Sequence, residues 1–278
     1  MKITNYFLLV LIIIISSCKK QENEIISSAP TFTPTVMTNL KGIILDKNQD
    51  PVSGVNVRLG NNLTSSSSNG LFTFNNISVS ENRAMIHFEK EGYFTTSRAC
   101  QVNNDVSNYI RVVMDEQQTI GNFFSSSGGS LIHNGVNLTF PSSSYFYTDG
   151  IEYNGDINVS INIISPEESN FSMRIPGGDL RARTTSEEDM ILYSYGMLDV
   201  ILTDNNNQPL TLNSTTQITF PIPNNLISSA PSEIPLWHYN DETGIWIQEG
   251  LAVKNGTSFE GNVSHFSYWN WDVPSQEA

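Results

Sequence analysis

The residues that could do chemistry in this chain stand far apart in the sequence. Zinc needs histidine or carboxylate ligands at close spacing, such as two histidines one helical turn apart. The four histidines, His87, His133, His238 and His265, instead fall in separate stretches with strand character. A metal site would have to be assembled by the fold, so the spacing predicts no metal site and no cofactor.

Hydrolytic sites are also poorly supported. Serine hydrolases often carry the nucleophile on a Gly-x-Ser-x-Gly turn, and the sequence has no such turn. Paired carboxylates could cleave glycosides, but the densest acidic cluster, Glu187-Glu188-Asp189, lies in a polar stretch typical of a solvated loop. We therefore predict no catalytic residues and no enzymatic activity. An enzyme would need a cleft that gathers His238, His265 and acids.

Oxygen ligands for calcium occur in two turns. Asp46, Asn48 and Asp50 belong to one, and Asp204 and Asn206 to the other. Neither turn has the glycine and the closing glutamate of an EF-hand loop. Hairpin turns rich in aspartate and asparagine explain both groups without a metal.

Aromatic residues crowd into the last part of the chain. Trp237 and Tyr239 share a face by period two, as do Trp269 and Trp271 if their segment is extended. Exposed rings could stack on sugars or bind a protein, whereas buried rings would fill the core of a domain poor in other large residues. The core interpretation is favoured. The candidate ligand-binding residues are Trp237, Tyr239, Trp246, Trp269 and Trp271.

The N-terminal segment has the composition of an export signal. Lys2 precedes an apolar run over residues 6–15, which is about half of what a membrane-spanning helix needs. The following Ile15-Ser16-Ser17-Cys18 resembles the lipobox of bacterial lipoproteins, with Ile15 where leucine is usual. The resemblance implies a signal peptide over residues 1–18 and a lipidated Cys18 that holds the protein in a bilayer. The alternative is an ordinary secreted protein.

The net charge of the chain limits the kinds of partner that it can bind. The net charge of −14, from 28 acidic and 14 basic residues, excludes a nucleic-acid partner, because phosphate binding needs lysine and arginine.

Apart from Cys18, Cys100 is the only cysteine in the chain. It has no disulfide partner once Cys18 is lipidated, and we expect it to be a packed thiol. Residues 19–38 are polar, contain Pro30 and Pro34, and are expected to be a flexible spacer.

Short apolar runs separated by turn residues follow from Leu40 and predict an all-β chain. The first module, residues 39–116, resembles the carboxypeptidase regulatory-like domain, which implies a seven-stranded, transthyretin-like β-sandwich without catalytic residues. In this module Gly54 and Gly70 allow turn conformations closed to other residues. The resemblance is carried by Leu40-Lys41-Gly42-Ile43, Asp46, Asp50-Pro51-Val52-Ser53-Gly54, Asn69-Gly70-Leu71-Phe72 and Glu91-Gly92-Tyr93.

The second module, residues 119–274, is expected to be a larger β-sandwich. Residues 157–163 alternate most cleanly, with isoleucine and valine on one face and asparagine and serine on the other. The module resembles the extracellular region of cartilage intermediate layer proteins. That likeness rests on Met173, Pro176 and Gly177, on residues 235–237 and on residues 265–270.

Together these features predict a membrane-anchored lipoprotein of the cell envelope, on the periplasmic or surface face of the outer membrane. Its expected role is that of a non-enzymatic structural or interaction module of the adhesion type. The alternative is a carbohydrate-binding surface lipoprotein that uses the C-terminal aromatic residues. The expected partners are the bilayer, through Cys18, and an unidentified protein or glycan.

Overall fold

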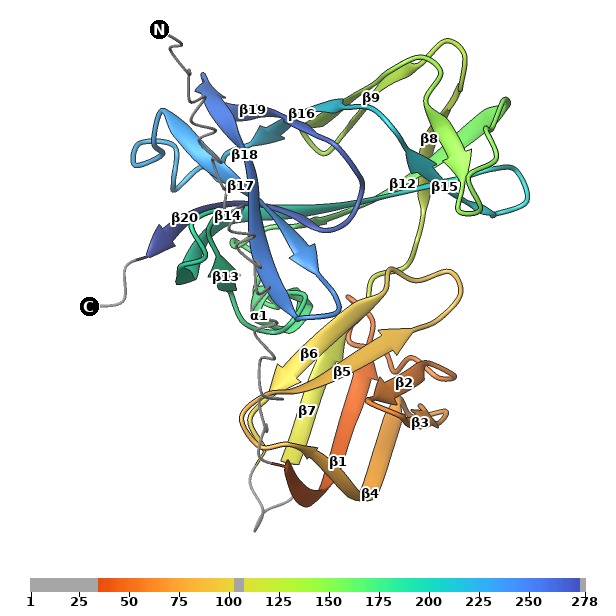
Figure 1. Ribbon diagram of the computed structural model, residues 1–278, viewed down its shortest axis with the longest axis vertical. Helices are drawn as coiled ribbons and strands as arrows, with labels where there is room; N and C mark the ends of the chain where they lie inside the picture. Colours follow the sequence, from red (N-terminus) through yellow and green to blue (C-terminus); the bar gives the residue numbers. More distant parts are fainter. Residues whose placement is uncertain (1–34, 103–107, 276–278) are drawn as a thin grey trace, which may run out of the picture. The chain divides into compact units, whose positions relative to one another are not determined.

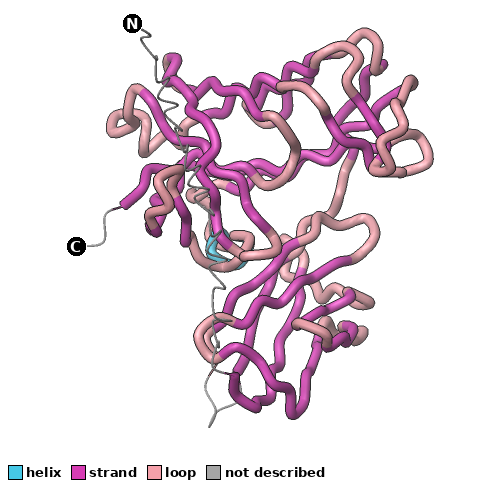
Figure 2. The backbone as a smooth tube through the Cα atoms, viewed as in Figure 1, coloured by secondary structure: helices cyan, strands magenta, loops and turns pink. Residues whose placement is uncertain are grey.

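The computed structural model describes residues 35–102 and 108–275. Cys18, the signal peptide and most of the predicted spacer lie outside the described residues. The helices and strands of the described residues are strands β1 to β20 and the four-residue helix α1, Phe171–Arg174. Figure 2 shows the strands in magenta and the helix in cyan. The predicted all-β fold class is therefore confirmed.

The first seven strands form two sheets (Figure 1). One has the order β4-β1-β7 and the other the order β3-β2-β5-β6. Their bounds are β1 (Thr35–Leu45), β2 (Asn56–Leu59), β3 (Asn62–Ser65), β4 (Leu71–Ser80), β5 (Ala84–Glu89), β6 (Thr96–Cys100) and β7 (Asn108–Val113). The side chains that alternate inward from both sheets form one buried cluster, which includes Leu40, Ile44, Phe72, Phe88 and Val112.

Local signals predicted most of these strands. Gly54 and Gly70 have positive φ angles of 68° and 71°, as expected for turn glycines. Three features were not predicted: strand β3, strand β6, and the start of β1 at Thr35, which places residues 35–38 of the predicted spacer in a strand. Strand β6 could not be predicted from alternating apolar residues, because its buried residues are polar: Thr96, Ser97 and Arg98.

The remaining strands belong to one hydrogen-bonded network, and their buried side chains form a second, larger hydrophobic cluster. The main path runs β11-β15-β14-β20-β17-β18-β19-β16-β10-β9, with β12 on β14 and β8, and β13 on β14 and β18. The bounds are β8 (Thr119–Phe124), β9 (Gly129–His133), β10 (Val136–Phe140), β11 (Tyr145–Tyr147), β12 (Asp156–Ile164), β13 (Arg181–Arg183), β14 (Asp189–Thr203), β15 (Pro209–Leu212), β16 (Thr216–Pro221), β17 (Glu233–Asn240), β18 (Ile245–Asn255), β19 (Ser258–Val263) and β20 (Trp269–Ser275).

Strand β17 is covered on both faces. Ile234 and Leu236 point into the larger hydrophobic cluster of these strands. Trp237 and Tyr239 point into a second cluster on the other face. This arrangement explains why residues 234–239 are almost continuously apolar, where a strand with one solvated face would alternate.

A buried acid lies next to this core. The side chain of Asp272 in β20 is fully buried and accepts hydrogen bonds from the backbone N–H of Tyr195, at 3.2 Å, and from the side-chain amide of Asn270. Burial raises the pKa of Asp272 to about 8 and that of Asp199, in the neighbouring β14, to about 7. Both carboxyl groups are therefore protonated in the folded protein at pH values where the unfolded chain is ionised.

This difference makes stability depend on pH. Because the folded pKa is raised, the free energy of unfolding should fall as pH rises above about 4, up to about pH 7 for Asp199 and up to about pH 8 for Asp272, with a limiting slope of at most about 1.4 kcal/mol per pH unit for each group. Urea unfolding of an Asp272→Asn variant should show a shallower pH slope than the unmodified protein. The matched control is Asp156→Asn at an exposed position, which should keep the original slope. Equal slopes in all three proteins would contradict the prediction.

Candidate functional site

The five aromatic candidates are core residues. Trp237, Trp246 and Trp271 are fully buried, Trp269 is 1% exposed and Tyr239 is 6% exposed. The indole N–H of Trp237 donates to the backbone oxygen of Asp272 and that of Trp269 to the backbone oxygen of His265, both at 2.9 Å. These burials agree with the core interpretation. Carbohydrate binding through these rings would need at least two of them exposed, and that condition is not met.

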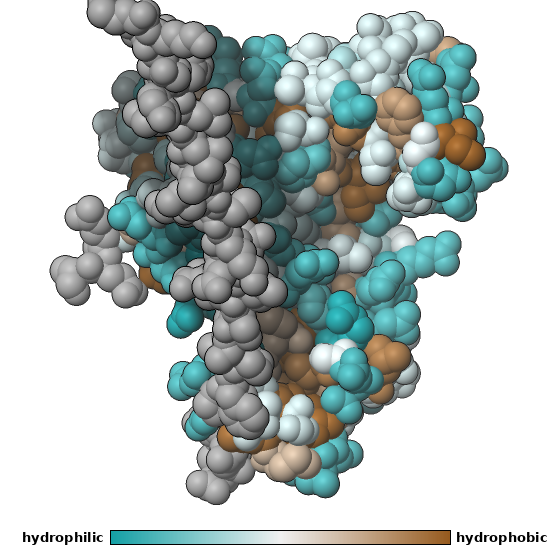
Figure 3. Space-filling view, in the orientation of Figure 1, coloured by the Kyte–Doolittle hydropathy of each residue, from teal (hydrophilic) through white to brown (hydrophobic). Residues whose placement is uncertain are grey.

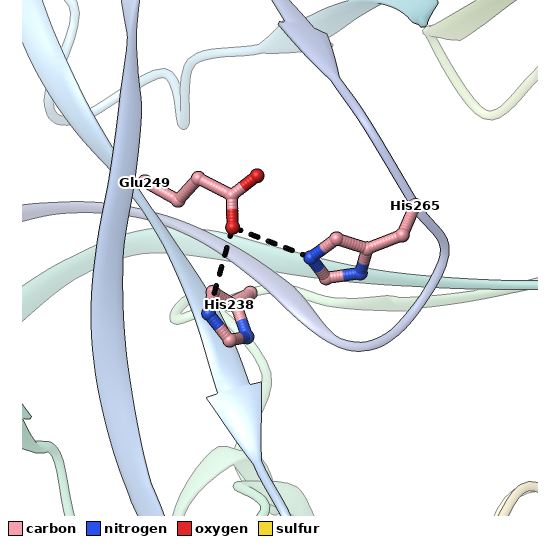
Figure 4. Close-up of side chains that lie close together, drawn as sticks. All are labelled: His238, Glu249 and His265. Carbon is pink, nitrogen blue, oxygen red and sulfur yellow. Dashed lines mark hydrogen bonds and ion pairs between the residues drawn. The ribbon is translucent and has the colours of Figure 1, made fainter. Parts of the chain in front are cut away.

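The structure does bring two of the four histidines together with an acid. Glu249 Oε2 lies 3.6 Å from His238 Nε2 and 3.4 Å from His265 Nε2 (Figure 4). The two imidazole rings lie nearly perpendicular, with their centroids 5.0 Å apart. One potential ligand atom from each residue lies within 4.8 Å of those of the other two. We call His238, Glu249 and His265 the His–Glu–His cluster.

Three separate segments supply this cluster. His238 lies on β17 opposite Ile247 of β18 and Trp269 of β20, while His265 lies in the loop between β19 and β20. Glu249 comes from a bulge in β18. The pairing of β17 with β18 shifts between Pro235 and Trp237, so that Glu249 and Gly250 together oppose one residue.

The bulge explains how Glu249 reaches the histidines. Gly250 has a φ angle of 87°, a conformation that residues with a side chain rarely adopt. A bulge of this kind locally re-aims the neighbouring side chain. Glu249 thus turns toward His238 and His265, and its other oxygen, Oε1, accepts a 2.6 Å hydrogen bond from the hydroxyl of Ser264.

The surroundings of His238 and Glu249 favour a neutral imidazole and an ionised carboxylate near neutral pH. Burial lowers the pKa of His238, and the neighbouring His265 lowers it further, although Glu249 acts in the opposite direction. Burial acts to raise the pKa of Glu249, but the hydrogen bond from Ser264 and the two imidazoles outweigh it and the pKa is lowered. The acid is therefore ionised and His238 neutral at pH 7, which is the state that binds a metal cation.

The other two histidines do not join them. His87 on β5 pairs instead with Asp241, at 3.1 Å. His133 lies at the end of β9. Glu249 was not singled out by the sequence analysis. The nearest sequence signal was the glycine that follows it, because a glycine inside a strand indicates a bulge.

The remaining candidates behave as ordinary structural residues. Burial raises the pKa of the Cys100 thiol to about 11, so this half-buried residue is not a thiolate nucleophile at neutral pH. Asp46 accepts hydrogen bonds from the backbone N–H groups of Asn48 and Asp50, and Asp204 from those of Asn206 and Gln208. Both calcium candidates therefore close Asx turns. In the acidic cluster Glu187 and Asp189 are exposed, as expected for solvated side chains, although Asp189 is the first residue of β14 and not part of a loop.

A second concentration of polar side chains joins the two groups of strands. The guanidinium of Arg98, on β6, is buried and donates to the backbone oxygen of Ile175 at 2.9 Å. The Ser97 and Tyr239 hydroxyls share a hydrogen bond of 2.6 Å. Gly177 exchanges backbone hydrogen bonds with Ser97 and Ala99, so residues 175–178 pair with the edge of β6.

Two further ion pairs belong to this junction. Arg83, just before β5, forms a bidentate ion pair with Asp179. Arg174 donates through Nε to Asp115 at 2.9 Å and through a terminal nitrogen to Asn162 at 2.8 Å. The Met173, Pro176 and Gly177 positions noted in the sequence thus lie where the two groups of strands meet. We call these contacts the module junction.

Comparisons with known proteins assign no family. No family model matches the chain, and no curated protein matches it. Solved structures with some likeness include a streptococcal ancillary pilin, which is 9% identical with a TM-score of 0.25 and is matched over 86% of this chain and 54% of its own. This chain thus spans about half of that pilin.

Two others are similarly distant. A protein of unknown function from Bacteroides fragilis is 7% identical over 87% of this chain and 99% of its own, with a TM-score of 0.24. The major pilin subunit of Bacillus cereus is 11% identical over 86% and 85%, with a TM-score of 0.23. These scores are too low to give this chain a family or a function. Within residues 35–102 and 108–275, no helix is both long and apolar enough to cross a membrane.

Proposed function

We propose that the chain is a lipid-anchored protein of the cell envelope that acts as a structural or interaction module and performs no catalysis. The anchor is Cys18, on the strength of the lipobox-like segment, and the proposed location is the periplasmic or surface face of the outer membrane. The first module is proposed to be a carboxypeptidase regulatory-like domain and the second a relative of the cartilage intermediate layer region, on the motifs given above.

The module junction is the observation that carries this proposal. Modules within one chain move relative to each other by default. Here the buried Arg98 and Arg174 are held by groups from the other set of strands, and Gly178 allows Arg98 to approach, since a Cβ there would lie 2.7 Å from the guanidinium. A junction of this kind suits a protein that presents surfaces in a fixed relation or bears load.

Surface for partners is available on both groups of strands. The face shown in Figure 3 is largely hydrophilic, with hydrophobic residues interspersed. Leu63, Tyr109 and Ile132 are exposed by 72%, 63% and 75% and come from β3, β7 and β9. Exposed apolar residues that are scattered in this way are common on soluble proteins. They therefore define no docking surface.

The anchor can be tested directly. In bacteria fed an alkyne-tagged fatty acid, the unmodified protein should carry the tag and sediment with membranes, because several acyl chains give stable binding where a single chain does not. A Cys18→Ala variant should lose the tag and leave the membrane fraction. Cys100→Ala is the matched control and should keep both properties.

Two results would overturn the proposal. One is a Cys18→Ala protein that remains tagged and membrane-bound. The other is hydrolysis of peptide, ester or glycan substrates by the purified protein that disappears in a His238→Ala variant. The second result would show an enzyme that uses the His–Glu–His cluster.

A further inference from the structure

We infer that His238, Glu249 and His265 form a binding site for a divalent transition metal ion, and that zinc is the ion the site fits. This inference does not depend on the proposed anchoring or on an interaction role. It rests on the spacing of the three side chains, on their donor atoms, on the groups that orient them and on their access to solvent.

The spacing of the donor atoms suits tetrahedral coordination. Ligand atoms on a zinc ion with bonds of about 2.0 to 2.1 Å lie about 3.3 to 3.4 Å apart. Glu249 Oε2 lies 3.4 Å from His265 Nε2 and 3.6 Å from His238 Nε2. Two of the three ligand separations therefore need almost no adjustment. The third, between the imidazoles, is limited by the 4.8 Å span of the cluster and can shorten by rotation of His265 in its loop.

The donor set discriminates among metals. Two imidazole nitrogens and one carboxylate oxygen suit zinc and its neighbours in the first transition row. Calcium and magnesium prefer ligand shells made entirely of oxygen, which these residues do not offer. Three protein ligands also leave a fourth tetrahedral position for water or for a group on a partner.

Neighbouring groups hold the ligands in place. Ser264 donates to Glu249 Oε1 and leaves Oε2 to face the histidines. The indole of Trp269 packs beside both imidazoles, with centroid distances of 5.8 Å to His238 and 5.0 Å to His265, and its N–H holds the backbone oxygen of His265. Outer contacts of this kind orient metal ligands and raise affinity.

The site is accessible to an ion from solution. Side-chain exposure is 20% for His238, 41% for Glu249 and 39% for His265. Because Glu249 and His265 are the more exposed, their substitution should leave the fold intact. Loss of binding in such variants can therefore be assigned to the site itself.

Zinc binding to detergent-solubilised, metal-free, full-length protein tests the inference, with Zn²⁺ alone as probe in competition with a chromogenic chelator. One Zn²⁺ should bind per chain. Binding should weaken by about 100-fold or more in His238→Ala, His265→Ala and Glu249→Gln, and by about 10-fold in Ser264→Ala. Zinc should also raise the Tm of the unmodified protein and not that of Glu249→Gln.

The controls separate this site from other histidines. His133→Ala and His87→Ala should bind zinc as the unmodified protein does, because neither residue belongs to the cluster. Affinity should fall as the pH is lowered, because protons compete with a metal ion for imidazole and carboxylate ligands. Absence of zinc binding, or equal binding by Glu249→Gln and the unmodified protein, would overturn the inference.

Discussion

Replacement of Trp271 by alanine should lower the free energy of unfolding by about 3 to 5 kcal/mol, as expected for a large aromatic side chain removed from a packed core. Trp271 is fully buried in β20 and stacks on Phe220, with ring centroids 4.3 Å apart and planes 11° from parallel. The loss combines the transfer of the ring from water with the cavity that it leaves. Urea unfolding followed by circular dichroism measures this change without relying on the fluorescence of the deleted residue.

Tyr193→Ala provides the matched control. Tyr193 lies on β14, which pairs with β20, and it is 55% exposed. Its replacement should change the free energy of unfolding by less than about 1 kcal/mol. The comparison also tests the role of the C-terminal aromatic residues. A Trp271→Ala protein that keeps its stability but loses saturable binding to a glycan array would restore the carbohydrate-binding alternative.

Replacement of Arg174 by alanine should cost about 3 to 5 kcal/mol, because it removes one partner from a buried charge network. The side chains of Arg174 and Asp115 are 7% and 11% exposed, and Asn162 beside them is 5% exposed. Alanine would leave the Asp115 carboxylate without its guanidinium and Asn162 without one hydrogen bond. Urea unfolding should show the loss, and amide exchange of β12 should accelerate with it.

Two further variants show whether the charge network is the cause. Arg181→Ala removes an arginine that is 61% exposed and whose Nε lies as far as 3.7 Å from the Asp179 carboxylate. This substitution should lower the free energy of unfolding by less than about 1 kcal/mol. A double variant, Arg174→Met with Asp115→Asn, removes the two most buried charges and leaves only Glu168, the partly exposed second partner of Arg174, so it should recover part of the stability lost in Arg174→Ala. An Arg174→Ala protein as stable as Arg181→Ala would contradict the prediction.

The network around Arg174 shows where period-two reasoning failed. Residues 157–163 alternate cleanly, and Ile157 and Val159 are buried as the pattern predicts. Further along the same strand, however, Asn162 is buried and the isoleucines beside it are only partly so. Asn162 is covered because it meets Asp115, Arg174 and Tyr268, which come from distant parts of the chain. A local pattern carries no information about such contacts.

The sequence by itself determined the class of structure. Alternation of apolar and polar residues is a property of the pleat, whose period is local, so β2, β4 and β5 could be predicted from a few residues each. Turn positions such as Gly54 and Gly70 are likewise set by the conformations open to single residues. The period of two also predicts that Trp237 and Tyr239 share one face of their strand, and that Trp269 and Trp271 share one face of theirs. The structure agrees, because the first pair lies in one buried cluster and the second pair in another.

Only the tertiary structure decided where chemistry could occur. His238, Glu249 and His265 meet because β17 pairs with both β18 and β20 and because a bulge at Gly250 turns Glu249 toward the histidines. Pairing partners and bulges depend on register across the sheet, which distant segments set together. The three residues of the His–Glu–His cluster are therefore neighbours in space although they lie 11 to 27 positions apart, and no motif in the sequence indicates that they meet.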